Sequence, residues 1–90
     1  VEGRDWDPKR LKKTMRLVDV KQEQEVRIVD IQGGKGVARK LQQLSLMPGD
    51  RVKVTKRAPL RGPLLVEAHG RSVALGRGVA AKVEVEQISS

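Results

Sequence analysis

Hydrophobic and polar residues alternate in short segments along most of the chain after position 25. The clearest case is residues 51–56, where Val52 and Val54 share one face of a strand and polar side chains share the other. Such alternation, with many β-branched residues, is typical of a strand with one buried face. The pattern predicts about five strands, at residues 26–31, 51–56, 64–68, 72–75 and 82–86.

The first of these strands has an imperfect pattern. Val26 and Ile28 fall on one face of residues 26–31, whereas Val29 and Ile31 fall on the other. This arrangement predicts burial on both faces of the strand. We expect a barrel core to cover the inner face and a helix to cover the outer one.

One helix is predicted between the first two strands, over residues 36–44. Val37, Leu41 and Leu44 recur at i, i+4 and i+7, which places one apolar stripe on the helix. A separate helical turn is expected where Leu17 and Val20 lie three residues apart. Five short strands are too few for two full sheets, so the fold class expected is mostly β, a small barrel with one inserted helix.

Glycine and proline mark the turns between these elements. Gly33, Gly34 and Gly36 permit a tight backbone path into the helix. A glycine-rich segment at this position can also bind phosphate, but Lys35 is not followed by Ser or Thr, so we favour a structural turn. Further turns are predicted at Pro48-Gly49-Asp50, residues 57–62 and His69-Gly70, with a bend, as short as one helical turn, over 76–81.

The domain is expected to span residues 15–88. Residues 1–14 carry many charges and few apolar side chains, which predicts an N-terminal extension or a tag. A helical turn beginning at Asp7-Pro8 is the one regular element expected there. Trp6, the only aromatic residue of the chain, either packs back on the domain or anchors a partner.

The formal net charge of +8 indicates an anionic partner, although a highly charged surface also simply keeps a small protein soluble. The chain has no cysteine, which excludes disulfides and thiolate metal sites. One histidine and no tyrosine leave few general acids or bases, so we expect a non-enzyme. No apolar run approaches the length of a membrane span, and the expected location is the cytoplasm.

Two groups of residues are candidates for binding. Basic residues on the predicted strand 51–56 and the loop after it could form a patch for an anionic partner or a plain solvated face. The set comprises Arg51, Lys53, Lys56, Arg57 and Arg61, with Arg71 and Arg77 as further cations. His69 could contribute to a weak transition-metal site, alone or with scattered carboxylates at Glu67, Glu84 and Glu86. No resident cofactor is expected.

Taken in order, these motifs resemble the FeoA domain family over residues 15–86. The likeness rests on Leu17 with Val20, the strand 26–31 with its glycine turn, the helix followed by Leu46-Met47-Pro48-Gly49-Asp50, the loop Ala58-Pro59-Leu60 with Gly62-Pro63, and the closing Val83-Glu84-Val85. Two departures stand out: Gln24-Glu25, where the family often has Gly, and Ser45, where it usually has Gly after the helix. If the left-handed cap is kept, Ser45 should cost about 1 kcal/mol.

The resemblance implies an SH3-type β-barrel with an added helix and a small cytosolic adaptor or regulator of ferrous-iron uptake. Its implied partner is the membrane GTPase transporter FeoB, without insertion of this chain into the membrane. The surface we expect to dock comprises Lys35, Arg39, Lys40, Leu46, Met47 and Pro48. A nucleic-acid-binding barrel and a metal-sensing domain like that of DtxR-type repressors are the alternatives.

Overall fold

The computed structural model describes residues 14–88. The expectations for Trp6 and for a helical turn at Asp7 lie outside the described residues, as do the last two serines. Within the described part of the chain, no helix is long and apolar enough to span a membrane.

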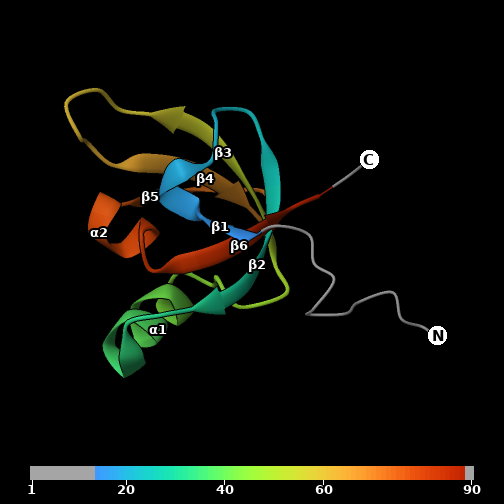
Figure 1. Ribbon diagram of the computed structural model, residues 1–90, viewed down its shortest axis with the longest axis vertical. Coiled ribbons are helices and arrows are strands. Elements are labelled where there is room, and N and C mark those ends of the chain that lie inside the picture. The colour runs from blue at the N-terminus through green and yellow to red at the C-terminus, as the bar shows by residue number, and fades with distance from the viewer. Residues whose placement is uncertain (1–13, 89–90) are drawn as a thin grey trace.

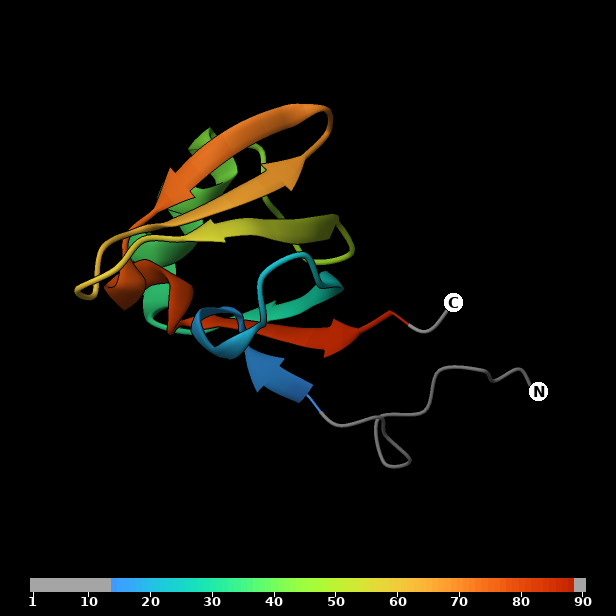
Figure 2. The same ribbon diagram turned by 90° about the horizontal axis from the view of Figure 1, so that it is seen from above.

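Six antiparallel strands form one sheet that curves around a single core (Figures 1 and 2). Their order across the sheet is β1-β6-β2-β3-β4-β5, and α1 lies against β2 at one end of the molecule. In chain order the elements are β1 Thr14–Arg16, the 3₁₀ turn η1 Leu17–Asp19, β2 Glu25–Ile31, α1 Gly34–Gln43, β3 Arg51–Arg57, β4 Leu64–Ala68, β5 Arg71–Leu75, α2 Arg77–Ala80 and β6 Val83–Gln87.

The prediction of a mostly β barrel with one inserted helix is confirmed, and the count of about five strands misses one. The sixth, β1, has only three residues and pairs with β6 through Met15 opposite Val85. Three residues are too few to show an alternation in sequence. The helical turns expected near Leu17 and within 76–81 are present as η1 and α2.

The core consists of the residues that alternate inward from the strands, together with apolar residues of η1, α1 and α2. Val26, Val54, Leu64, Val66 and Val85 are fully buried. Because Leu41 of α1 and Leu17 of η1 are fully buried with them, the helical segments close the barrel rather than lie on it.

The expectation for the two faces of β2 is wrong for Ile31. The pairing of β2 with β6 shifts by one residue between Ile28 and Asp30, which indicates a β-bulge at Val29. After the bulge, Ile31 pairs with the buried Val83 and packs against the same core as Ile28. The bulge therefore restores inward alternation, and Val29 is the only apolar residue of β2 that does not pack against the core.

The turn before α1 requires glycine because its backbone packs closely against the helix. Gly33 has a φ of +91°, and a Cβ atom there would lie 2.8 Å from the Val37 side chain. The preceding residue, Gln32, donates its N–H to the carbonyl of Lys82, 2.7 Å away, which ties the turn to the residue just before β6. Helix α1 runs from Gly34 to Gln43, two residues earlier at its start than predicted.

The C-terminus of α1 is closed by a Schellman motif. The N–H of Leu46 donates to the carbonyl of Leu41 at 2.8 Å, and the N–H of Ser45 donates to that of Gln42 at 2.9 Å. Ser45 takes a φ of +65°, the left-handed conformation that glycine adopts without a steric penalty. The left-handed cap is thus kept even though the residue is serine.

Replacing Ser45 with glycine is therefore expected to stabilise the domain. Relief of the left-handed strain outweighs the extra chain entropy of glycine in the unfolded state, for a net gain of about 0.5–1 kcal/mol. Thermal or urea unfolding measures this difference. Ser45→Ala is the matched control, because it retains the Cβ atom and should give no gain; equal stability of the two variants would contradict the strain argument.

Candidate functional site

A rigid turn follows the helix and presents one apolar side chain to solvent. The N–H of Asp50 donates to the carbonyl of Met47 at 3.0 Å, with Pro48 and Gly49 at the central positions and a φ of +98° at Gly49. This is the predicted β-turn, of type II. The Asp50 carboxylate accepts the N–H of Met47, and Gly49 N–H donates to the carbonyl of Ile28, which fastens the turn to β2.

The two apolar residues before this turn have opposite environments. Leu46 is fully buried, because the Schellman motif directs it onto Leu41 in the core. Leu46 therefore cannot contact a partner, and its prediction as a docking residue is wrong. Met47 is 48% exposed, one of two large apolar side chains so exposed among the described residues.

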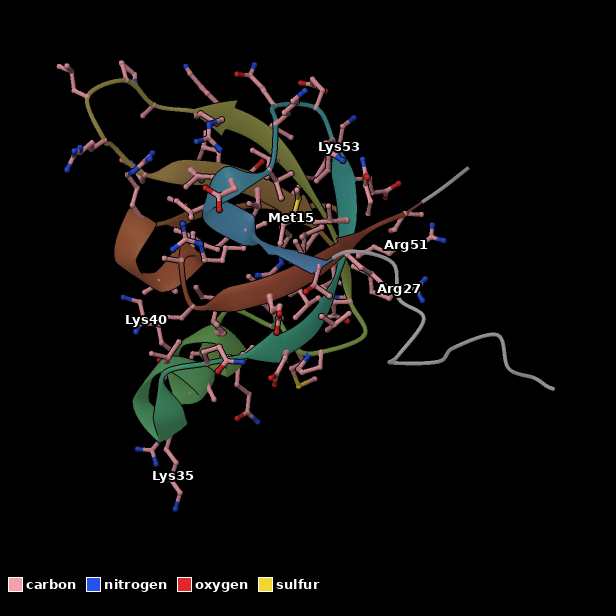
Figure 3. The ribbon with its side chains drawn as sticks, viewed as in Figure 1. Met15, Arg27, Lys35, Lys40, Arg51 and Lys53 are labelled. Atoms are coloured by element: carbon pink, nitrogen blue, oxygen red, sulfur yellow. The ribbon has the colours of Figure 1, made fainter. Side chains whose placement is uncertain are left out.

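The basic residues of α1 divide between two faces. Lys35, Arg39 and Gln42 are spaced at i, i+4 and i+7 and form one row along the exposed side of the helix. Lys40 lies about 100° around the axis from Arg39. In Figure 3, Lys35 and Lys40 extend from the helix in different directions. Lys40 therefore lies on another side of α1 than the row that contains Arg39.

The β4–β5 hairpin completes the surface around Met47. His69 and Gly70 have φ values of +55° and +75°, as a two-residue type I′ turn requires, so the predicted hairpin turn is confirmed. Arg71 Nη2 donates to the carbonyl of Leu44 at 3.3 Å, near the C-terminus of α1. A shallow depression of about 550 Å³ lies here, lined by Gln42, Ser45, Met47, Asp50, His69 and Arg71.

We call this surface the Met47 face. Its side chains are two arginines, a lysine, a histidine with the nearby Asp50 carboxylate, polar groups from the helix end, and one thioether on a fixed turn. Such a set can bind a partner that combines carboxylates with an apolar residue, since Met adapts to irregular pockets and Arg binds carboxylates bidentately. The Met47 face comprises the residues that line the depression, the adjoining Pro48, and the two cations in the helix row of Gln42: Gln42, Ser45, Met47, Asp50, His69, Arg71, Pro48, Lys35 and Arg39.

His69 has one potential co-ligand. Its Nε2 lies 3.4 Å from Oδ2 of Asp50, whose carboxylate already accepts the backbone N–H of Met47. Within residues 14–88 no group of three or more His, Asp or Glu side chains is placed to hold a metal ion. A metal site at His69 therefore stays a prediction, with Asp50 as its nearest carboxylate.

The predicted basic strip is interrupted by acidic residues. On the outer face of the sheet, Lys53 pairs with Glu25 on one side and Glu67 on the other, and its Nζ lies 3.4 Å from Glu23. Arg51 lies opposite Arg27, and both point away from the barrel at the same end of the sheet (Figure 3). Acidic residues flank Lys53 on both neighbouring strands, so this face offers no continuous positive track for a phosphate backbone.

Arg57 is turned toward the core and does not belong to the strip. The pairing of β3 with β4 shifts between Val54 and Lys56, so a bulge at Thr55 reverses the alternation and places Arg57 opposite the buried Leu64. Arg57 Nη1 donates to the carbonyls of Val18 and Val20 at 2.8 and 2.7 Å. Lys56 and Arg61 remain exposed at the end of this hairpin.

Gln42, Ser45 and Arg71 were not predicted from the sequence as docking residues, and His69 was predicted only as a metal ligand. Extending the β3–β4 register from Lys53 opposite Glu67 places residue 69 opposite residue 51, beside Asp50. Alternation alone does not fix that register, because the bulge at Thr55 shifts the pairing of β3 with β4. The signal for Gln42 is its spacing from Arg39 along the helix.

Comparison with known proteins agrees with this fold. The FeoA domain family model matches residues 15–87. A candidate Fe(2+) transport protein A of Methanocaldococcus jannaschii is 31% identical over 70 residues, which cover 78% of this chain and 83% of that protein.

Solved structures are similar over most of the described residues. A crystal structure of an iron uptake regulatory protein (FeoA) has a TM-score of 0.77 at 26% identity and covers 86% of this chain and 100% of its own. The FeoA-like protein of Clostridium acetobutylicum reaches 0.80 at 22% identity, covering 89% and 93%. A manganese-dependent transcriptional repressor reaches 0.77 at 17% identity, over 83% of this chain and 42% of the repressor, which shows a shared fold alone. The SH3-like barrel is therefore confirmed, and the chain belongs to the FeoA family.

Proposed function

We propose that this protein is a cytosolic adaptor of ferrous-iron uptake that docks on the cytosolic part of a FeoB-type GTPase transporter through the Met47 face. In this proposal it has no catalytic role. The observation that carries the choice of surface is the exposed Met47, fixed on a hydrogen-bonded turn at the end of a basic helix face. The family membership supports the transport role.

The rigidity of the turn supports docking at this place. Interface energy is concentrated in a few well-placed side chains, and binding costs less when those side chains are already ordered. Met47 is held by its N–H bond to Asp50, and the turn is tied to Ile28 by a second bond. Met47 can therefore enter a partner pocket without much loss of backbone freedom.

Charge supports the same assignment. Lys35 and Arg39 are exposed on α1, and α1 contains no acidic residue. A partner surface with carboxylates around an apolar pocket would be attracted by these cations and would bury Met47 at its centre. The transporter domain is expected to present such a surface.

A double variant, Met47→Asp with Arg39→Glu, is expected to weaken binding to the cytosolic region of the cognate transporter about a hundredfold. The variant places a carboxylate in the apolar pocket of the partner and reverses one charge. At a hot spot, each change should weaken the affinity by about tenfold or more. Calorimetry or a pull-down with purified domains measures it.

The matched control is Leu60→Asp with Lys40→Glu, which introduces the same two acidic residues and the same change in net charge on other surfaces. The control should bind as the wild type does. Equal affinities of the two double variants would show that the transporter does not use the Met47 face, and absence of wild-type binding would remove the adaptor proposal.

A further inference from the structure

The β3–β4 hairpin ends in an apolar side chain that nothing in the fold covers. Leu60 is 96% exposed, the most exposed large apolar side chain among residues 14–88. Figures 1 and 2 both show the loop between β3 and β4 projecting beyond the ends of the strands. A leucine in this position buries nothing within its own domain, so its contribution must be sought outside it.

The tip holds an unfavourable backbone conformation. Gly62 donates its N–H to the carbonyl of Pro59 at 3.1 Å, and the two residues between them, Leu60 and Arg61, have φ values of +58° and +62°. These are the φ values of a type I′ turn, where Asn and Gly are strongly preferred and leucine is disfavoured. Another residue at this position would make the domain more stable, so a strained tip with an exposed leucine suggests a role other than stability.

The base of this hairpin is firmly held. Arg57 donates two hydrogen bonds to the carbonyls of Val18 and Val20, and Ala58 N–H donates to the carbonyl of Pro63 at 3.2 Å. A Cβ atom on Gly62 would lie 2.8 Å from the Cβ of Ala58, so the two sides of the loop are in close contact. The tip is consequently a fixed projection.

The segment around the tip carries positive charge only. Residues 51–66 contain five basic residues and no acidic one. Of these, Lys56 and Arg61 are exposed nearest to Leu60, whereas Arg57 is engaged at the base. An apolar side chain flanked by cations with long aliphatic stems is suited to a surface that is apolar beneath an anionic layer.

We propose that this tip, Lys56 to Arg61, contacts an anionic membrane surface, with Leu60 in the boundary between headgroups and acyl chains and Lys56 and Arg61 at the lipid phosphates and carboxylates. A narrow projection with one large apolar residue presents little of the broad area that a protein interface requires, whereas a bilayer needs no matching shape. The contact is peripheral, and it adds a shallow anchor where the sequence predicted no membrane insertion.

The position of the tip leaves the Met47 face free. The Met47 turn precedes the first residue of β3 and the hairpin tip follows its last, so the two lie about 20 Å apart along the strand. The tip proposal does not depend on the transporter proposal. A protein that engages a membrane transporter gains residence time at the membrane from a second weak contact.

Co-sedimentation with vesicles tests the proposal. The full chain should bind vesicles of phosphatidylcholine with one quarter phosphatidylserine and show little binding to phosphatidylcholine alone. Leu60→Asn should weaken binding about fivefold, because an apolar contact is lost. Lys56→Gln with Arg61→Gln should weaken binding roughly tenfold, because two cations leave the surface.

Two controls separate this contact from general charge attraction. Lys35→Gln with Arg39→Gln removes the same charge from α1 and should change vesicle binding less than twofold. Leu60→Asn should melt at the wild-type temperature or above it, since Asn suits the left-handed position, and should bind the transporter domain as the wild type does. Failure here is thus distinguishable from failure of the transporter proposal.

A position-specific probe gives the direct readout. Because the chain has no cysteine, Leu60→Cys and Met47→Cys can each carry one environment-sensitive fluorophore. The label at 60 should shift to the blue and be quenched by brominated lipid, and the label at 47 should not. Absence of binding to the anionic vesicles, equal effects of the two Lys/Arg double variants, or a label at 60 that responds only to the transporter domain would overturn the proposal.

Discussion

Leu46→Ala is expected to lower the free energy of unfolding by about 3 kcal/mol, which is within the range for truncating a buried leucine to alanine. Leu46 is fully buried, and it meets Leu41 at the point where the Schellman motif ends the helix. Truncation leaves a cavity between α1 and the sheet. Domains of this size are stable by only about 5–10 kcal/mol, so the melting temperature should fall by more than 10 °C.

Met47→Ala is the control for Leu46→Ala. It removes a neighbouring side chain that is 48% exposed, and a loss below about 1 kcal/mol is expected. Urea unfolding of the two variants measures the difference. Similar losses in both would contradict the assignment of Leu46 to the core and Met47 to the surface.

Arg57→Met is expected to cost about 2–3 kcal/mol. The change removes two charge-assisted hydrogen bonds and leaves the carbonyls of Val18 and Val20 without these donors next to buried side chains. Methionine keeps most of the aliphatic volume, so the loss reports the hydrogen bonds rather than a cavity. The same denaturation experiment measures it.

Lys56→Met serves as the comparison, because Lys56 precedes Arg57 in β3 and is exposed. This variant should stay within about 0.5 kcal/mol of the wild type. If Arg57→Met proved as harmless as Lys56→Met, the inward position of Arg57 and the bulge that produces it would be wrong.

Most of the fold follows from the alternation of hydrophobic residues. Each strand after position 50 was predicted from apolar residues that recur with period two. Val52, Val54 and Val66 are examples, and the structure buries all three. The turns at Pro48-Gly49 and His69-Gly70 were predicted because these residue types match the turn positions. Both features depend on residues close together in the chain, so one sequence is enough to predict them.

Two of the errors arise where a bulge changes the period. At Val29 the bulge moves Ile31 to the core, and at Thr55 it moves Arg57 inward, away from the charged outer face. A bulge depends on how two strands pair over their whole length, and nothing in the residues themselves marks it. The basic patch was therefore assigned one residue that the barrel uses for its own stability.

The composition of the Met47 face was predicted in part. Lys35, Arg39, Met47 and Pro48 were predicted from the helix and its turn. Of the other two predicted residues, Leu46 is buried, and Lys40 is exposed on another side of the helix. Leu46 is buried because of the helix cap, which depends on the left-handed conformation of Ser45. The position of Lys40 follows from the helical angle between neighbours, which sequence spacing already contains.

Nuclear magnetic resonance offers the most direct test of the central proposal, that the Met47 face binds a FeoB-type transporter. A chain of 10.0 kDa gives resolved amide signals, which can be followed while the unlabelled cytosolic domain of the transporter is added. We predict that the largest shifts fall on Arg39, Gln42, Ser45, Met47 and Arg71. Shifts confined to the outer sheet face around Lys53, or no shifts at saturating transporter domain, would contradict the account.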